Sequence, residues 1–154
     1  LEAFGKHALL DMKISCKGDT HVDFHHSVED VGIVIGTLLK EAIYPVSGIE
    51  RFGDSVVVMD EAAVSCALDL SNRAFLVYEN FNEKGKVGEF DIELAEEFFR
   101  AVSMNANITL HIAKLRGRNN HHIIEAAFKS FAVALRRALA KNPRVNTPST
   151  KGVL

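Results

Sequence analysis

The stretch His25-His26-Ser27-Val28-Glu29 decides how the rest of the chain is interpreted, because its pattern returns 96 positions later as His121-His122-Ile123-Ile124-Glu125. Each copy opens a run of apolar residues spaced three and four apart, which is typical of an amphipathic helix. Each copy also follows a helical pattern and then an alternating, strand-like pattern. The same order of elements therefore occurs twice, which indicates an internal repeat.

The elements of this repeat can be given bounds from their periodicity. Helices are predicted at residues 1–7, 28–43, 91–104 and 122–139. Strands are predicted at residues 9–16, 55–59, 63–70, 75–78 and 108–115. The fold class that follows is α/β, of the α+β kind, in which a small unit of sheet and helices is duplicated.

The repeat also suggests a division of the chain. Residues 1–50 would form the remainder of the first half, and residues 51–141 the second half. Residues 142–154 are polar and contain proline, so we predict a C-terminal arm there. The chain begins within a helical pattern and without a methionine, and we expect a segment of the protein to precede Leu1.

Composition limits the classes of function. A chain of 154 residues with 47% hydrophobic content can bury a core, and a net charge of −2 offers no broad basic surface for nucleic acid. No apolar run is long enough to span a membrane. Cys16 and Cys66 form no paired framework, which favours a reducing compartment such as the cytoplasm.

The repeated motif has the composition of a metal site. In each copy the second histidine and the glutamate are three positions apart and share one helix face, while the first histidine lies in the entry turn. Two imidazoles and a carboxylate suit manganese, iron, zinc or nickel better than calcium or magnesium. One such motif alone could be a surface histidine pair, but a duplicated one favours metal binding. Two metal positions follow, either close together in one chain or completed by neighbouring subunits.

Six dispersed motifs together resemble imidazoleglycerol-phosphate dehydratases, over essentially the whole chain. They are residues 23–32, Arg51-Phe52-Gly53, Met59-Asp60-Glu61-Ala62, Leu68-Asp69-Leu70-Ser71-Asn72-Arg73, residues 120–126 and residues 149–154. The resemblance implies a duplicated fold related to the second domain of ribosomal protein S5. It also implies trimers that assemble into a particle of twenty-four subunits, with manganese sites at subunit interfaces.

The resemblance assigns roles to individual residues. Metal ligands would be His25, His26, Glu29, Glu97, His121, His122 and Glu125, with two Mn²⁺ ions, or other divalent transition metals, in each active site. Some members carry histidine at the position of Glu97. Residues that bind the phosphorylated substrate would be His7, Arg51, Arg73, Lys129, Ser149 and Lys151.

The reaction that the resemblance implies removes water from imidazole glycerol phosphate and yields imidazole acetol phosphate, a step of histidine biosynthesis. Binding of both ring nitrogens by two metals would favour the imidazolate, whose electrons can expel the hydroxyl beside the ring. Glu125 or Glu29 would carry protons, and the choice between them stays open.

Two other hypotheses use the same residues. A two-metal hydrolase would form a metal hydroxide and release inorganic phosphate, whereas the dehydratase leaves the phosphate attached. A metal-buffering shell protein would assemble with metal but show no turnover, and it would leave Arg51, Arg73 and Lys151 without a purpose.

Overall fold

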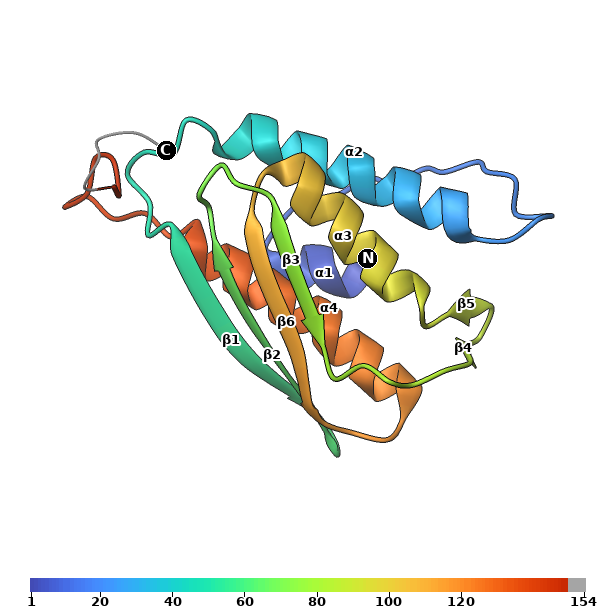
Figure 1. Ribbon diagram of the computed structural model, residues 1–154. Coiled ribbons are helices and arrows are strands. Elements are labelled where there is room, and N and C mark those ends of the chain that lie inside the picture. The colour runs from blue at the N-terminus through green and yellow to red at the C-terminus, as the bar shows by residue number, and fades with distance from the viewer. Residues whose placement is uncertain (150–154) are drawn as a thin grey trace.

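The structure, a computed structural model, describes residues 1–149 and places helices on one side of a four-stranded sheet (Figure 1). The sheet contains β1 (Phe52–Met59), β2 (Ala62–Asp69), β3 (Phe75–Glu79) and β6 (Thr109–Arg116). The helices are α1 (Glu2–Ala8), α2 (His25–Ile43), α3 (Leu94–Ala106) and α4 (Asn120–Ala138). A small hairpin of β4 (Lys86–Val87) and β5 (Phe90–Asp91) precedes α3. The predicted α/β class is confirmed.

The sheet has the strand order β1-β2-β6-β3. β1, β2 and β6 run antiparallel to one another, and β3 runs parallel to β6. β1 shows the alternation: Gly53 and Ser55 are buried, whereas Phe52 and Val56 on either side of them are exposed. Because successive side chains of a strand point to opposite faces, β1 presents Gly53 and Ser55 to the helices and Phe52 and Val56 away from them.

The helices form two layers over the covered face. α4 packs on β1 and β2, and α3 packs beside β3. α1 then contacts α4, and α2 contacts α3, farthest from the sheet (Figure 1). The helices of the first half therefore pack on the helices of the second half. This packing between the halves brings the starts of α2 and α4, which carry the two histidine motifs, into the same part of the molecule.

Glycines allow two of these contacts to be close. A Cβ atom on Gly36 of α2 would lie 2.8 Å from the carbonyl oxygen of Val102 in α3, and one on Gly53 would lie 2.0 Å from the carbonyl oxygen of Ala134 in α4. Both distances are shorter than van der Waals contact. Neither element could approach its partner as closely with any larger residue.

An aromatic cluster fills the space between the helices. Phe4 of α1 stacks on Phe131 of α4 with ring centroids 5.2 Å apart, and both side chains are fully buried. Phe99 of α3 meets Phe131 edge-on at 5.8 Å. Burial of each such ring contributes about 1.5–3 kcal/mol, so Phe4 is the main anchor of the short α1.

One predicted strand is wrong. Residues 9–16 alternate apolar and polar side chains, but the structure gives them no strand, and most of them are exposed. α1 ends at Leu9, which adopts a left-handed conformation with φ 59°. A strand requires a hydrogen-bonded neighbour, and none of the strands within residues 1–149 pairs with this segment. The other predicted strands and helices are present, with ends shifted by a few residues.

The division into repeat halves stays a prediction. Within the described part of the chain the second half carries the sheet, and the first half contributes helices. No helix of the described residues is both long and apolar enough to cross a membrane.

Candidate metal centre

Both histidine motifs lie in the first turn of a long helix, where hydrogen bonds fix the backbone. The Asn119 side chain accepts the backbone N–H groups of His121 and His122 at 2.9 and 3.2 Å, an N-cap of α4. Asp23 Oδ1 accepts the N–H of His25 at 2.8 Å at the start of α2. The two rings of each motif lie 6.2 Å apart and nearly perpendicular, at 88° and 74°. The repeated sequence therefore has a repeated geometry.

The second histidine of each motif is held by a carboxylate. His26 Nδ1 lies 2.9 Å from Asp19 Oδ2, and His122 Nδ1 lies 2.8 Å from Glu61 Oε2. An ionised carboxylate only accepts hydrogen bonds, so in each pair the ring donates from Nδ1. The Nε2 atom of each neutral ring then keeps its lone pair for a metal ion, as is usual for metal-binding histidines.

These hydrogen bonds shift the pKa values of His26 and Glu61. The hydrogen bond to Asp19 raises the pKa of His26. The hydrogen bond from His122, aided by the N–H groups of Asn119 and Arg118, lowers the pKa of Glu61 to about 2. Glu61 is therefore an anion at any physiological pH. Since a metal binds only the neutral ring, a proton on His26 competes with a metal at that site.

Glu125 connects the second motif to a lysine. Its Oε2 atom lies 2.9 Å from His121 Nε2, and its Oε1 atom lies 2.7 Å from Lys129 Nζ. The hydrogen bond from Lys129 is the main cause that lowers the pKa of Glu125. Glu125 is thus an anion beside a histidine nitrogen, while Lys129, assigned to phosphate by the resemblance, is already paired.

A mostly apolar cavity of about 620 Å³ lies between the two motifs. Ser27 and Val28 of the first motif line it from α2, and His121 and Glu125 of the second line it from α4. Phe98 of α3 contributes to its wall. The motifs therefore border a shared space, although they are far apart in sequence.

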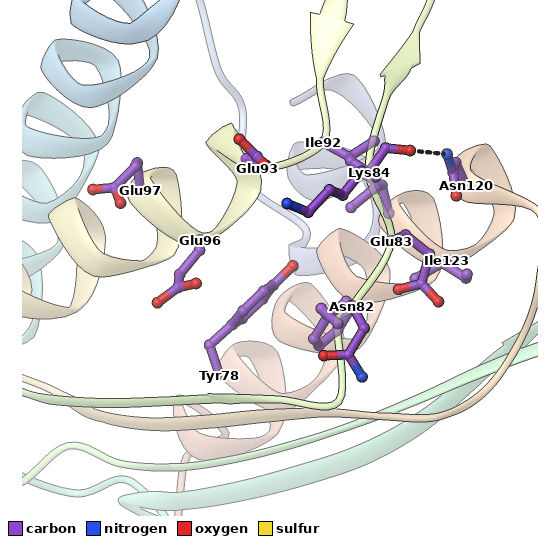
Figure 2. A pocket seen from close by; sticks show the side chains of 12 residues that line it. Tyr78, Asn82, Glu83, Lys84, Ile92, Glu93, Glu96, Glu97, Asn120 and Ile123 are labelled. Atoms are coloured by element: carbon purple, nitrogen blue, oxygen red, sulfur yellow. Dashed lines mark hydrogen bonds between the residues drawn. The ribbon is translucent and has the colours of Figure 1, made fainter.

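Glu97 lines a different cavity, of about 390 Å³, which lies between the start of α3, the start of α4 and the segment after β3 (Figure 2). Glu93, Glu96 and Glu97 line it from the start of α3, and Asn120 lines it from the start of α4. Glu97 Oε2 lies 4.0 Å from Arg100 Nε, an exposed ion pair. The acidic wall suits a cation, but Glu97 is not grouped with the histidines.

Within the described part of the chain, the candidate ligands do not gather at one point. Among residues 1–149, no three or more His, Cys, Asp or Glu side chains converge on one point that could hold a metal ion. The donors fit a divalent transition metal in kind, since imidazole nitrogens and carboxylate oxygens are presented at the motifs.

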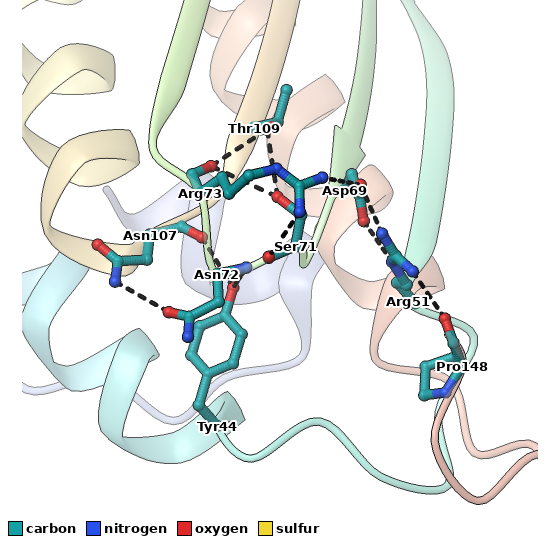
Figure 3. A network of polar contacts seen from close by, with 9 residues as sticks. All are labelled: Tyr44, Arg51, Asp69, Ser71, Asn72, Arg73, Asn107, Thr109 and Pro148. Atoms are coloured by element: carbon teal, nitrogen blue, oxygen red, sulfur yellow. Dashed lines mark hydrogen bonds and ion pairs between the residues drawn. The ribbon is translucent and has the colours of Figure 1, made fainter. Parts of the chain in front are cut away.

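Two of the predicted phosphate residues meet at Asp69 (Figure 3). Arg51 Nε and Nη2 donate to the two carboxylate oxygens of Asp69 at 2.6 and 3.0 Å, and Arg51 Nη1 donates to the carbonyl oxygen of Pro148 at 2.7 Å. Arg73 Nη2 lies 3.8 Å from the same carboxylate, and its side chain is 70% exposed. Arg73 is open to a ligand, whereas Arg51 ties the C-terminal arm to the sheet.

The remaining predicted substrate residues are spread over the chain. His7 lies in the last turn of α1, and its carbonyl oxygen accepts a hydrogen bond from Arg136 at 3.2 Å. Ser149 follows Pro148 on the arm that Arg51 holds, and its N–H donates to the carbonyl oxygen of Thr147 at 2.8 Å. Lys151 lies outside the described residues.

Comparison with known proteins decides the family. A family model described as imidazoleglycerol-phosphate dehydratase matches residues 1–135. The chain belongs to the imidazoleglycerol-phosphate dehydratase family. The sequence-based prediction of a dehydratase of histidine biosynthesis, a lyase, is therefore confirmed.

Relatives and solved structures of this family match nearly the whole chain. The imidazoleglycerol-phosphate dehydratase of Campylobacter concisus is 79% identical over all 154 residues, which cover 79% of that protein. The dehydratase of Campylobacter hominis is 74% identical over the same 154 residues, which cover 80% of its length. The crystal structure of the Staphylococcus aureus dehydratase has a TM-score of 0.85 at 45% identity, covering 92% of this chain and 80% of that one. The Pyrococcus furiosus structure has a TM-score of 0.86 at 38% identity, covering 99% and 82%.

The structure adds residues to which the sequence gave no role. Asp19 and Glu61 bind the histidine rings, and Asp69 joins the two arginines. Glu61 and Asp69 stand within motifs of the family resemblance, but no periodicity links Glu61 to a histidine 61 residues away. Only the sheet, which brings the turn between β1 and β2 to the start of α4, reveals that contact.

Proposed function

We propose that this chain removes water from imidazole glycerol phosphate to form imidazole acetol phosphate in histidine biosynthesis. Membership of the dehydratase family is the observation that carries the proposal. The two equivalent motifs support it, because the imidazole ring of this substrate has two nitrogen atoms that can each bind a metal, and one cavity reaches both motifs, through Ser27 and Val28 of the first and His121 and Glu125 of the second. The phosphoester hydrolase considered from the sequence has no support from the family.

The proposal includes two divalent metal ions, manganese in the first place, held by His25, His26, Glu29, Glu97, His121, His122 and Glu125. Bound at the Nε2 atoms, such ions would supply Lewis acidity toward the nitrogens of the substrate ring. The chain itself orients these atoms, because Asp19 and Glu61 hold the opposite nitrogens of His26 and His122.

Proton transfer is assigned to the glutamates of the motifs. The proton to be removed lies on a carbon that bears a hydroxyl and has no neighbouring carbonyl to acidify it, so a base must be close and ionised. Glu125 has these properties, because Lys129 stabilises its anion and it borders the cavity. Glu29 occupies the equivalent position in the first motif and is the alternative base.

The phosphate of the substrate would bind near the C-terminal arm. Arg73 offers an exposed guanidinium, which can bind two phosphate oxygens at once. Arg51 holds Pro148 and thereby the arm beside Ser149; Lys151 belongs to the proposed set and lies outside the described residues. Arg51 still has free N–H groups after its three contacts, so it can both hold the arm and contact the phosphate. His7 and Lys129 complete the proposed set.

The active unit in this proposal is an assembly of identical chains, trimers that build a particle of twenty-four subunits. Two features support assembly. Within residues 1–149 of one chain, the candidate ligands do not gather at one point. The open face of the sheet carries exposed apolar side chains of Phe52, Val56, Val58 and Phe75, at 58–69% exposure, and such a patch usually marks an interface. A cytoplasmic location belongs to the same proposal and agrees with the absence of a disulfide between Cys16 and Cys66.

Genetic complementation tests the proposed function. A histidine auxotroph that lacks its own dehydratase should grow without added histidine when it expresses the protein, and should not grow when it expresses the His121→Ala variant. A matched Glu89→Ala variant, changed at an exposed residue of the β4–β5 turn, should support growth. Growth with His121→Ala, or no growth with the unchanged protein, would contradict the proposal.

A further inference from the structure

The environment of His122 differs from that of a simple surface ligand. Its side chain is 23% exposed and has a carboxylate near each ring nitrogen: Glu61 Oε2 at 2.8 Å from Nδ1, and Asp60 Oδ2 at 3.6 Å from Nε2. Only the first distance is a hydrogen bond. Rotation of the ring by 180° about the Cβ–Cγ bond would put the carbon Cδ2 in the place of Nδ1 and lose that bond, so Glu61 selects one of the two orientations.

Glu61 also fixes the backbone that leads to His122. Its second oxygen, Oε1, accepts the N–H groups of Arg118 and Asn119 at 3.1 and 2.8 Å. Asn119 in turn caps α4 by accepting from the N–H groups of both motif histidines. One carboxylate in the turn between β1 and β2 therefore sets the start of α4 and the direction of the His122 ring.

The first motif meets the same requirement with a different residue. Asp19, seven positions before His26, accepts from Nδ1 of that ring at 2.9 Å. Asp19 lies in the segment before α2, whereas Glu61 comes from the sheet, so the two carboxylates do not correspond in the repeat. That both motifs place a carboxylate on the same ring atom from unrelated positions indicates a requirement on the ring rather than an accident of the duplication.

We propose that Glu61 is a positioning residue for metal binding, which holds His122 with Nε2 directed toward the metal, and that Asp19 does the same for His26. This inference rests on the metal part of the proposed function, and it adds two residues that act through the ligands without being ligands. Partners of this kind typically change metal affinity by about 10–100-fold when removed.

Manganese binding to metal-free protein tests the inference without any turnover. Mn²⁺ is titrated into the wild type, Glu61→Ala, His122→Ala and the double variant, and free Mn²⁺ is followed by electron paramagnetic resonance. Glu61→Ala should weaken one class of sites about 10–100-fold and leave the other unchanged. In the His122→Ala background the same change should have a much smaller effect, because only the action of Glu61 on the backbone at the start of α4 then remains. Glu89→Ala is the control and should bind Mn²⁺ as the wild type does.

The same cycle with Asp19→Ala and His26→Ala keeps the test valid if loss of Glu61 impairs folding, since Asp19 lies in a loop and is 41% exposed. Unchanged affinity in Glu61→Ala and Asp19→Ala would overturn the inference. An undiminished effect of Glu61→Ala in the His122→Ala background would also overturn it, because the residue would then act on the fold or the metal directly. If the wild type bound no Mn²⁺, this inference and the metal part of the proposed function would fail together, while complementation would still judge the reaction.

Discussion

Replacement of Asp69 by asparagine should cost much more stability than its single-atom change suggests. Asp69 and Arg51 are 18% and 13% exposed, and both carboxylate oxygens receive hydrogen bonds from the guanidinium. Asparagine keeps one acceptor and turns an N–H₂ group toward the second donor. Hydrogen bonds to charged groups contribute about 1.5–3 kcal/mol each, and the partly solvated position reduces the cost of the orphaned charge, so Asp69→Asn should lower the free energy of unfolding by about 2–3 kcal/mol.

Urea unfolding at a fixed protein concentration measures this loss, since assembly would make the stability depend on concentration. Glu96→Gln is the matched control: it breaks a carboxylate–arginine pair of 2.5 Å to Arg100, but in side chains that are 42% and 50% exposed. Its expected effect is about 0.3–0.5 kcal/mol, as for exposed pairs one helical turn apart. Equal, small effects of the two substitutions would refute the reasoning that the Arg51–Asp69 pair holds the arm to the sheet.

Three further predictions follow from the structure. Gly53→Ala should lower the free energy of unfolding by about 3 kcal/mol or more in the same urea assay, because its Cβ would meet backbone atoms of α4. Gly88→Ala, which has nothing near its Cβ, should cost only about 1 kcal/mol for its positive φ. Similar values for the two variants would contradict the close packing. The pKa of Glu61 is lowered to about 2 in the folded state, so its ionised form stabilises the fold above the unfolded pKa near 4.5. The free energy of unfolding should therefore fall as the pH drops from about 4.5 to about 2, and less steeply in Glu61→Gln, in acid titrations followed by circular dichroism. Parallel titration curves of the two proteins would contradict this role of Glu61. Removal of metal with a chelator should abolish dehydration of imidazole glycerol phosphate, and added Mn²⁺ should restore it; full activity after chelation would disprove the metal requirement.

Local sequence predicts most of the fold, because apolar periodicity reflects which face of each element is buried. α4 has both a capping residue and a long amphipathic pattern, and its prediction at 122–139 differs from the observed helix by two residues at the start. Residues 9–16 have an equally clear alternation but no strand, since alternation shows only that a segment could pair, while a strand also requires a partner.

The sequence predicts a set of candidate ligands, and their binding of metal stays a prediction, but it does not predict how the side chains around them are arranged. The duplicated motifs identify His25, His26, His121 and His122 because these residues recur at equal spacing. The carboxylates that orient these rings come from other parts of the chain. Arg51 donates three hydrogen bonds, two to Asp69 and one to Pro148 of the arm, and a motif match cannot show this. Contacts between distant segments depend on strand order and helix packing, and no local pattern encodes them.

Direct turnover of imidazole glycerol phosphate is the measurement that tests the central claim. Purified protein loaded with Mn²⁺ is incubated with the substrate, and ³¹P nuclear magnetic resonance follows the phosphomonoester and inorganic phosphate while the ketone is assayed in parallel. We predict formation of the ketone with all phosphorus retained as monoester, and loss of this activity in His121→Ala. Release of inorganic phosphate would instead indicate the hydrolase, and the absence of any product from the wild-type protein would contradict the proposed function.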